Sequence, residues 1–431
     1  MKVHGAALAV VPIGRPEWRV ARRPRGALAV IPWGSEGPRG AIAAALAAPG
    51  GLPSARIDRP AAGRHNGVMM EIAIVGLPLV GKTNLFDALT AGHAATAPRG
   101  SSLEPQRAMV RVTDPRLQAL AGAFEPPKVT PATVGYVDTG AITGGAFESG
   151  QVTPGLLAAL RSVDAFAHVV RAFESDRVPH VHDSIDPARD AQGLDDEFAL
   201  ADLQIVESRQ DRVARELRVR KDPALNAEAA VLTRCREALE AGTPLRALEF
   251  SDAEDKAIRG FQFLTQKPLM LVVNIGEEQV GDDEVERPLA AWREAPNTRV
   301  VSLCVELEME LSELPAEDAA TFRADMGLPD EAAMDRLVHE SHCVLGLTTF
   351  YTAGENEVRA WTTGAGSTAV EAAGAIHTDF ARGFIRAETA GWDELSELGG
   401  YAGARDAGKL RLEGKEYVVQ DGDVLLIRFN V

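Results

Sequence analysis

Short apolar segments alternate with amphipathic segments of helical spacing from Met70 to about residue 303. Six of the apolar segments have the length and composition of strands. They are Glu71–Val75, Ala108–Val112, Thr133–Asp138, Ala165–Val170, Pro268–Asn274 and Arg299–Leu303. Strands that alternate with helices are typical of a parallel sheet that is covered on both faces. The pattern therefore predicts an α/β fold with a parallel-rich sheet.

A long stretch from about Asp195 to Leu264 interrupts this alternation. It has apolar residues at helical spacing, namely Leu200, Leu203, Val206, Val213 and Leu217. Dense charge of alternating sign surrounds them, which suits a solvent-exposed helical pair inserted into the α/β domain. Such a hairpin is either a partner-binding arm or a spacer, and the pattern fits both.

The last 85 or so residues change character again. Five short β-rich runs surround two short helical stretches near Thr368–Ile376 and Trp392–Leu398. The β-rich runs are Thr348–Tyr351, Val358–Thr362, Phe384–Glu388, Tyr417–Val419 and Val424–Phe429. This pattern predicts a small α+β domain over 346–431, after an α/β domain over 69–198 and 265–345 that is interrupted by a helical insert over 199–264.

The first 68 residues lack sustained periodicity and are rich in Ala, Gly, Pro and Arg. We interpret them as a disordered extension. Two alternatives stay open. The stretch is Arg-rich and acid-poor like a transit peptide, although it is poor in Ser and has no continuous amphipathic helix. Translation could also begin at Met69 or Met70, immediately before the first predicted strand.

The formal net charge of −17 is unevenly distributed, because residues 1–68 hold ten Lys/Arg and three Asp/Glu, which leaves −24 for the remainder. An acidic surface repels phosphate, so we expect no DNA binding, and any RNA contact requires a local basic patch. The three cysteines, Cys235, Cys304 and Cys343, match no metal-ligand spacing, which favours reduced thiols in a cytoplasmic protein. The longest apolar runs are too short to span a bilayer.

The pattern Gly-x-x-x-x-Gly-Lys-Thr occupies Gly76 to Thr83, directly after the first predicted strand and before a helix at about Asn84–Leu89. Backbone N–H groups of such a turn and the positive end of the next helix converge on a phosphate. Lys82 would reach the β- and γ-phosphates, and the Thr83 hydroxyl would bind Mg2+. The alternative is an ordinary turn that carries two glycines and a lysine, but the full spacing favours a nucleotide-binding protein.

Two later strand ends carry further candidate residues. Asp138 closes the third strand, where an acidic residue can hold Mg2+ through water, although an Asp there is also common as a helix cap or turn residue. Asn274 closes the fifth strand, where an Asn can fix the phosphate loop and a following acidic residue can read a base. Gly276 and Glu277 do not reproduce the Asn-Lys-x-Asp arrangement that selects guanine, so we expect weak guanine specificity.

From about Met70 to Val431 the chain resembles the Obg-like ATPases, the YchF family. The stretches that carry this resemblance are Ile74-Val-Gly-Leu-Pro-Leu-Val-Gly-Lys82, Asp114-Pro-Arg-Leu117, His168-Val-Val-Arg171, Leu200-Ala-Asp-Leu203, Phe350-Tyr-Thr-Ala-Gly354, Val358-Arg-Ala-Trp361, Ile376-His-Thr-Asp379, Gly383-Phe-Ile-Arg-Ala-Glu388, Arg411-Leu-Glu-Gly-Lys415, Val419-Gln-Asp-Gly-Asp423 and Arg428-Phe-Asn-Val431. The resemblance implies a P-loop ATPase with a helical arm and a C-terminal β-grasp TGS domain, a module linked to RNA and ribosome interaction.

The resemblance also implies roles for individual residues. It gives the phosphate site as Leu79, Val80, Gly81, Lys82, Thr83 and Asn84, in the loop that begins at Gly76. It gives Mg2+ to Thr83 and Ser102, and the base site to Asn274, Ile275 and Glu277, with the Ile275 backbone against adenine. Catalysis would fall to Lys82 and to a loop histidine, His180, since the apolar Ile142 replaces the glutamine of small GTPases. The alternative for His180 is a solvated loop residue beside His182.

The chain departs from the family pattern in its hydrolytic loops. After Asp138 it reads Thr139-Gly140-Ala141 where the family has a Gly that donates to the γ-phosphate, and Arg99-Gly100-Ser101 precedes Ser102. Alanine restricts positive φ and close backbone approach, so binding is better supported than turnover.

We therefore expect a slow Mg2+-dependent ATPase that acts as a conformational switch on ribosomes or ribosomal RNA, through the arm and the TGS domain. An ATP-binding scaffold with negligible hydrolysis is the alternative, and a GTPase is the third. A C-terminal basic patch could contact RNA, or its residues could be scattered and solvated; they are Arg382, Arg386, Lys409, Arg411, Lys415 and Arg428.

Overall fold

The computed structural model describes residues 70–93, 105–147, 149, 151–329 and 331–430. The expected extension over 1–68, the candidate magnesium ligand Ser102 and the altered segment 99–101 lie outside the described residues.

The first sheet has six strands in the order β2-β4-β1-β5-β6-β7. Its strands are β1 (Glu71–Val75), β2 (Gln106–Arg111), β4 (Thr133–Asp138), β5 (Ala165–Arg171), β6 (Leu269–Asn274) and β7 (Thr298–Leu303). All neighbours are parallel except β2 and β4, which pair antiparallel at one edge. The predicted parallel-rich α/β sheet is confirmed, and its carboxyl ends, where ligands bind in such sheets, lie along one border.

Both faces of this sheet are packed. In β1, Ile72 and Ile74 belong to one hydrophobic cluster, and Ala73 and Val75 belong to the other. Helices α1 (Lys82–His93) and α10 (Ala333–Val344) contribute to the first cluster. Helix α3 (Pro154–Ser162) and the first turns of α4 (Pro187–Val219) contribute to the second. Strands buried on both faces explain why their sequences read as continuous apolar runs.

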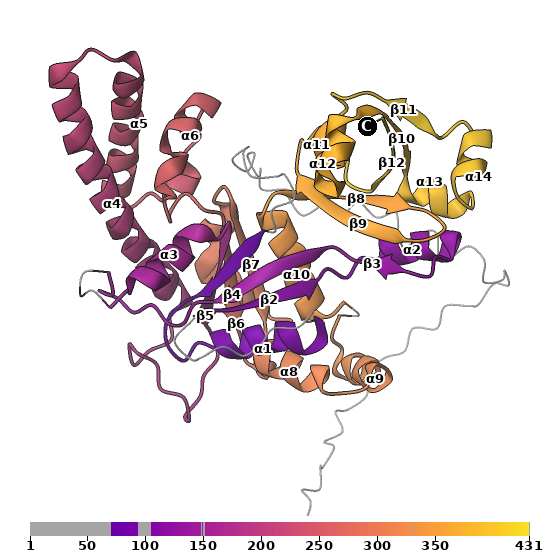
Figure 1. Ribbon diagram of the computed structural model, residues 1–431. Helices are drawn as coiled ribbons and strands as arrows, with labels where there is room; N and C mark the ends of the chain where they lie inside the picture. Colours follow the sequence, from indigo (N-terminus) through magenta and orange to yellow (C-terminus); the bar gives the residue numbers. More distant parts are fainter. Residues whose placement is uncertain (1–69, 94–104, 148, 150, 330, 431) are drawn as a thin grey trace, which may run out of the picture. The chain divides into compact units, whose positions relative to one another are not determined.

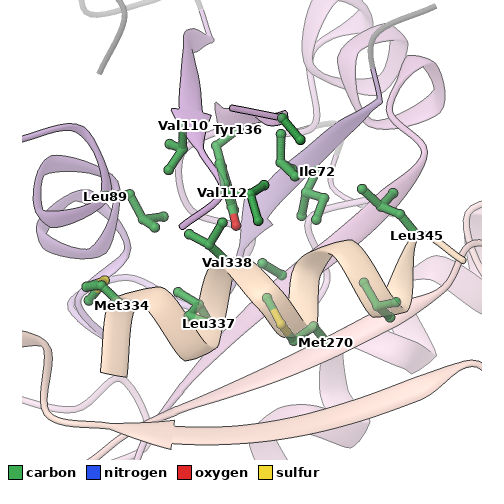
Figure 2. Packing of buried hydrophobic residues seen from close by; sticks show 14 of the residues in the cluster. Ile72, Leu89, Val110, Val112, Tyr136, Met270, Met334, Leu337, Val338 and Leu345 are labelled. Carbon is green, nitrogen blue, oxygen red and sulfur yellow. The ribbon is translucent and has the colours of Figure 1, made fainter. Parts of the chain in front are cut away.

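Helix α10 shows how the first face is filled. Met334, Leu337 and Val338 of this helix belong to the same buried cluster as Ile72 and Met270 of the sheet, part of which Figure 2 shows. These side chains are 5% exposed or less, so they are part of the core rather than a surface stripe.

The helical insert is a pair of helices, α4 and α5 (Pro223–Glu240), that lie side by side (Figure 1). Asp186 and Asp222 cap their N-termini, each followed by a proline at the first helical position. At the root of α4, the buried Asp202 accepts the backbone N–H groups of Leu264 and Thr265. Burial of Asp202 raises its pKa to about 6.

Shorter elements complete this part of the chain. They are η1 (Leu245–Ala247), α6 (Asp252–Ile258), η2 (Arg259–Phe261), η3 (Glu277–Gln279), η4 (Asp283–Leu289), α7 (Ala290–Glu294), α8 (Val305–Ser312) and α9 (Ala316–Met326). Among the described residues, no helix combines the length and the hydropathy that a membrane span requires.

The second sheet has the strand order β11-β10-β12-β8-β9-β3. Its elements are β8 (Leu347–Ala353), β9 (Val358–Gly364), α11 (Ala369–Ile376), α12 (Thr378–Arg382), β10 (Phe384–Gly391), α13 (Trp392–Glu397), α14 (Tyr401–Asp406), β11 (Arg411–Glu413) and β12 (Asp423–Phe429). The predicted strand at 417–419 is wrong, because only Val418 forms an isolated bridge, with Thr368. Strand β11, which was not predicted, pairs with β10 instead.

The sixth strand of this sheet comes from much earlier in the chain. Strand β3 (Val129–Thr130) pairs parallel with β9. The preceding helix α2 (Pro115–Phe124) packs on α13, β8 and β9. Asp114 caps α2 and accepts a hydrogen bond from the Tyr351 hydroxyl at 2.5 Å, and Arg116 donates to Asp421 at 2.5 Å. These contacts join the C-terminal sheet to the segment that follows β2.

Replacing Leu337 with Ala tests the packing of α10. Leu337 is fully buried, so we expect Leu337→Ala to lower the free energy of unfolding by about 2–5 kcal/mol, from lost burial and the cavity that remains. Leu314→Ala is the matched control, since this leucine is 41% exposed, and we expect a change below about 1 kcal/mol. Urea unfolding measures both. Equal losses in the two variants would contradict the role of Leu337 in the core.

Candidate functional site

The loop between β1 and α1 requires both of its glycines. Gly76 has φ +144°, and a Cβ there would lie 2.5 Å from the Val169 carbonyl oxygen. Gly81 has φ +99°, and a Cβ there would lie 2.4 Å from Nδ2 of Asn274. Between them Leu79, at φ 61°, is a left-handed residue with a side chain, a strained conformation of the kind that gathers at ligand sites. The segment from Gly76 to Thr83 therefore has the backbone conformation expected of a phosphate-binding loop.

Asn274 holds this loop from the neighbouring strand end. Its Nδ2 donates to the Val80 carbonyl at 3.0 Å, and its Oδ1 accepts the Val305 N–H at 3.2 Å. The side chain is buried, where an unmade hydrogen bond is costly, so it favours one arrangement of the two loops. Asn274 therefore links the phosphate loop to the segment that follows β7.

Lys82 and Thr83 open helix α1 at the carboxyl edge of the sheet. Lys82 is 6% exposed and its Nζ donates to the Leu77 carbonyl at 2.5 Å. Burial lowers the pKa of Lys82 to about 8, and the carboxylate of Asp138 opposes this shift. Asp138 lies at the end of β4, with Oδ2 3.4 Å from the Thr83 hydroxyl, and Asn84 is exposed next to Thr83. Three of the predicted phosphate and metal residues are thus brought together.

The oxygen atoms of Thr83 and Asp138 suit a hard cation such as Mg2+. Across the part of the chain that the structure describes, no group of three or more His, Cys, Asp or Glu side chains could hold a metal alone. In phosphate sites Mg2+ is held by few protein ligands together with several phosphate or water oxygens.

The candidate base-reading residues follow β6. Ile275 is buried, and its N–H donates to the Leu303 carbonyl. Glu277 begins η3 and is exposed. The N–H of Gly276 is bound by the Gln279 side chain at 2.8 Å, which fixes the turn between Asn274 and Glu277.

The segment after Asp138 packs against the start of the phosphate loop. The Thr139 hydroxyl donates to the Ile74 carbonyl, and the Ile142 N–H donates to the Gly76 carbonyl at 3.1 Å. The Ile142 side chain is 2% exposed, so it lies in the core, whereas Ala141 is exposed. The burial of this position explains why it holds an apolar residue, where small GTPases have a glutamine.

His180 is not a solvated loop residue, and that alternative is wrong. Its side chain is 5% exposed, and Nε2 lies 3.0 Å from Oδ2 of Asp190 in the first turn of α4. Its Nδ1 accepts the backbone N–H of His182 at 3.2 Å. Nδ1 is thus hydrogen-bonded, whereas Nε2 and Oδ2 are buried side by side and make no hydrogen bond with any described residue.

The loop that carries His180 is held by Arg171, at the end of β5. The guanidinium donates to the carbonyls of Phe173 and Val178 at 3.0 and 2.9 Å, and it lies 4.3 Å from the centroid of the Phe173 ring. The Arg171 side chain was not predicted as part of a site. The stretch His168–Arg171 carried the resemblance, but nothing in it indicated that the arginine would bind backbone carbonyls.

His168, in the same strand, is 1% exposed and no hydrogen-bond partner is found for it among the described residues. Burial lowers its pKa to about 4, so the imidazole is neutral near pH 7. It lines a pocket between β5, the segment after Asp138 and the root of α4. The pocket is lined by Leu77, Ile142, Thr143, Gly144, His168, His182, Arg189, Asp190, Gly193, Leu194 and Glu197.

Glu197 is a second residue of α4 that sequence reasoning missed. Its carboxylate accepts the backbone N–H groups of Gly145 and Phe147 at 2.5 and 3.2 Å. Like Asp190, it lies in the charged sequence of the inserted helix, where acidic residues resemble ordinary solvated ones. No sequence signal distinguishes them, because their partners lie in other loops.

Comparisons with known proteins find relatives over most of the chain. The family YchF-GTPase_C, with the description "Protein of unknown function (DUF933)", matches residues 347–430. The Ribosome-binding ATPase YchF of Bacillus subtilis (strain 168) is 42% identical over 362 residues, which cover 83% of this chain and 98% of the relative. Obg-like ATPase 1 of Oryza sativa subsp. japonica is 32% identical over 385 residues, covering 88% and 96%.

Solved structures are similar over the same region. The Schizosaccharomyces pombe YchF GTPase superposes with a TM-score of 0.74 at 28% identity, covering 86% of this chain and all of that one. A GTP binding protein from Pyrococcus horikoshii OT3 has a TM-score of 0.54 at 19% identity, covering 84% and 100%, and shows the fold alone. With relatives of this identity matched over nearly their whole length, the chain belongs to the YchF family.

Proposed function

We propose that this chain binds Mg-ATP in the loop from Gly76 to Thr83 and hydrolyses it slowly, as a conformational switch that associates with ribosomes. The observation that carries the proposal is the convergence of Lys82, Thr83 and Asp138 beside a loop that Asn274 holds in place. Curated relatives at 40 and 42% identity carry the name Ribosome-binding ATPase YchF, in agreement with it.

Each part of the loop has a role in binding. The backbone N–H groups from Leu79 to Asn84, at the start of α1, would face the phosphates, and Lys82 would supply a positive charge. Thr83 and Asp138 would hold Mg2+, which neutralises charge on the phosphate oxygens when bound. Ser102 completes the proposed metal site only by resemblance.

The base site supports ATP over GTP. A guanine site uses a short carboxylate that accepts from N1 and N2 of the base. Here the Asn274 side-chain amide is hydrogen-bonded to the Val80 carbonyl and the Val305 N–H. The nearby carboxylate is that of Glu277, three residues after Asn274, and its side chain is longer than that of Asp. We propose that the Ile275 backbone lies against adenine. Two of the similar structures carry GTP in their names, so GTP is the direct competitor in any test.

Slow turnover is supported by the hydrolytic loops. Ala141 stands where a Gly N–H would approach the γ-phosphate, and Ile142 is buried. His180 is the proposed catalytic group, and its side chain is buried against Asp190, with Nδ1 bound to the His182 N–H. Hydrolysis therefore requires this loop to rearrange. An ATP-binding scaffold without turnover is the second candidate, favoured by the burial of the His180 side chain.

The arm offers a more suitable RNA contact than the C-terminal domain. Four of the six basic C-terminal candidates lie within ion-pair distance of carboxylates, namely Arg382, Lys409, Arg411 and Arg428. At the tip of the arm, Arg212, Arg215, Arg218 and Lys221 are exposed, and within the described ranges no carboxylate pairs with them. Val219, between them, is 88% exposed. We propose that this tip contacts ribosomal RNA, because unpaired cations on an acidic chain select a polyanion.

Equilibrium binding of labelled ATP and GTP tests the nucleotide proposal. We expect micromolar affinity for ATP and weaker affinity for GTP. Lys82→Ala should weaken ATP binding at least about tenfold, roughly 1.4 kcal/mol. Lys256→Ala, which removes an exposed lysine on α6, is the control and should bind as the parent does. Tighter binding of GTP, or equal binding by Lys82→Ala, contradicts the proposal. Single-turnover hydrolysis no faster than that of Lys82→Ala supports the scaffold instead.

The pH dependence of ATP binding tests the role of Lys82. Its pKa of about 8 in the free protein means that the ammonium loses its proton as the pH rises through 8. We expect ATP affinity to fall about tenfold between pH 7 and pH 9, because only the charged form binds phosphate strongly. Calorimetric titration measures this. Lys82→Arg, whose guanidinium stays charged, should change less than about twofold, and an equal loss in both proteins would rule out Lys82 as the titrating group.

Neutralising the arm tip tests the RNA contact. Arg218→Gln with Lys221→Gln should weaken ribosome co-sedimentation and lower the slope of log K against log salt by roughly 1.4 to 1.8, since about 0.7–0.9 is expected for each of the two phosphate contacts. The control is Lys256→Gln with Arg259→Gln, which removes two exposed charges, one in α6 and one in η2. ATP binding should be unchanged in both. An unaltered salt slope in the tip variant would remove the tip from the contact.

A further inference from the structure

Glu197 is buried without a cationic partner. Its residue is 7% exposed, and within the described ranges no Lys, Arg or His lies at ion-pair distance from it. Its carboxylate instead accepts two backbone N–H groups of the loop after Asp138, those of Gly145 and Phe147. Burial of a carboxylate is costly unless its charge is satisfied by hydrogen bonds. The loop amides therefore account for the position of this side chain.

The neighbouring residue of α4 holds the same part of the loop. The Phe147 ring packs edge-on against the Phe198 ring, with centroids 6.2 Å apart. Phe198 in turn lies 4.8 Å from Phe166 of β5. Hydrogen bonds from Glu197 and ring packing from Phe198 thus attach the loop to α4 by two independent interactions.

Asp190, on the same helix, lies against the second hydrolytic loop. It lies seven residues before Glu197, two turns along the same face of α4. Its Oδ2 is 3.0 Å from Nε2 of His180, and the side chains are 1% and 5% exposed. Both carboxylates line the pocket that also contains Ile142 and His168. The root of one helix therefore contacts both segments on which hydrolysis is proposed to depend.

We propose that Asp190 and Glu197 are positioning residues that hold these two loops in a resting arrangement, and that a partner bound to the arm controls hydrolysis by releasing them. In the resting arrangement the His180 side chain is buried against Asp190, its Nδ1 accepts the His182 N–H, and the Ile142 N–H is bound to the Gly76 carbonyl. The inference rests on the proposed function, because it concerns the regulation of that same ATP site.

The geometry of α4 supplies a physical route for this control. The helix runs without interruption for 33 residues, from Pro187 to Val219. Glu197 and the exposed Val219 are thus joined by a continuous helix of roughly 33 Å, at 1.5 Å per residue. A force applied at the tip acts on the carboxylates at the root, and breaking their contacts shifts the population towards the released arrangement.

Glu197→Gln tests the inference, with Glu207→Gln as the matched control on an exposed part of α4. Amide hydrogen exchange in nucleotide-free protein should show about tenfold faster exchange at Gly145 and Phe147 in Glu197→Gln, and no change in the control. In steady-state hydrolysis, we expect kcat without ribosomes to rise about threefold to tenfold. KM should change less than about twofold, because Glu197 lies outside the phosphate loop. Stimulation by ribosomes should shrink by the same factor as basal kcat rises.

Other results would overturn the inference. Unchanged exchange at both amides means that Glu197 does not hold the loop, whether or not the protein binds ATP. Faster exchange with an unchanged or lower kcat means that the contact does not restrain hydrolysis. If the variant fails to fold, ribosomes added to the parent protein decide the matter, since exchange at Gly145 and Phe147 must then rise. Failure of the proposed function is distinguishable, because Lys82→Ala would bind ATP as the parent does.

Discussion

The side-chain amide of Asn274 is the interaction on which the geometry of the site depends. It binds the Val80 carbonyl on one side and the Val305 N–H on the other. The phosphate loop is strained at Leu79 and passes so close to Asn274 that only a glycine fits at position 81. A buried amide with both ends satisfied compensates for such a backbone. The position of Lys82, and through it the charge offered to a phosphate, follows from this one side chain.

Most of the central sheet could be predicted from the sequence, because its signals are local. The strands are continuous apolar runs, and the motif from Gly76 to Thr83 predicts both the turn after β1 and the start of α1. The antiparallel direction of β2 was not predictable in this way. An edge strand of the same composition fits either direction, and its pairing is decided by where the chain goes afterwards, which here is to α2 and β3 in the other sheet.

The residues that hold the hydrolytic loops could not be predicted, for a physical reason. Asp190, Glu197 and Arg171 bind partners that are distant along the chain or that are backbone atoms without sequence identity. From sequence alone, a carboxylate in a highly charged helix is expected to be solvated, because its tertiary contacts are not encoded in the local pattern. The C-terminal basic residues show the converse, since most of them are paired with carboxylates although their sequence suggests a patch. The sequence shows which charged residues a domain contains, whereas ion pairing in the fold determines which of those charges are available to a partner.

Strand β3 has a consequence for how the chain is made and divided. The C-terminal sheet is completed by a strand that leaves the ribosome about 230 residues before its partner β9, so during synthesis β3 remains an unmatched edge until nearly the whole protein exists. For the same reason, a gene fragment cut to the family match at 347–430 would encode a sheet with an open border at β9. The C-terminal domain therefore cannot be exchanged as one continuous segment. A recombination event that transfers its complete sheet would have to carry both β3 and the segment from β8 to β12.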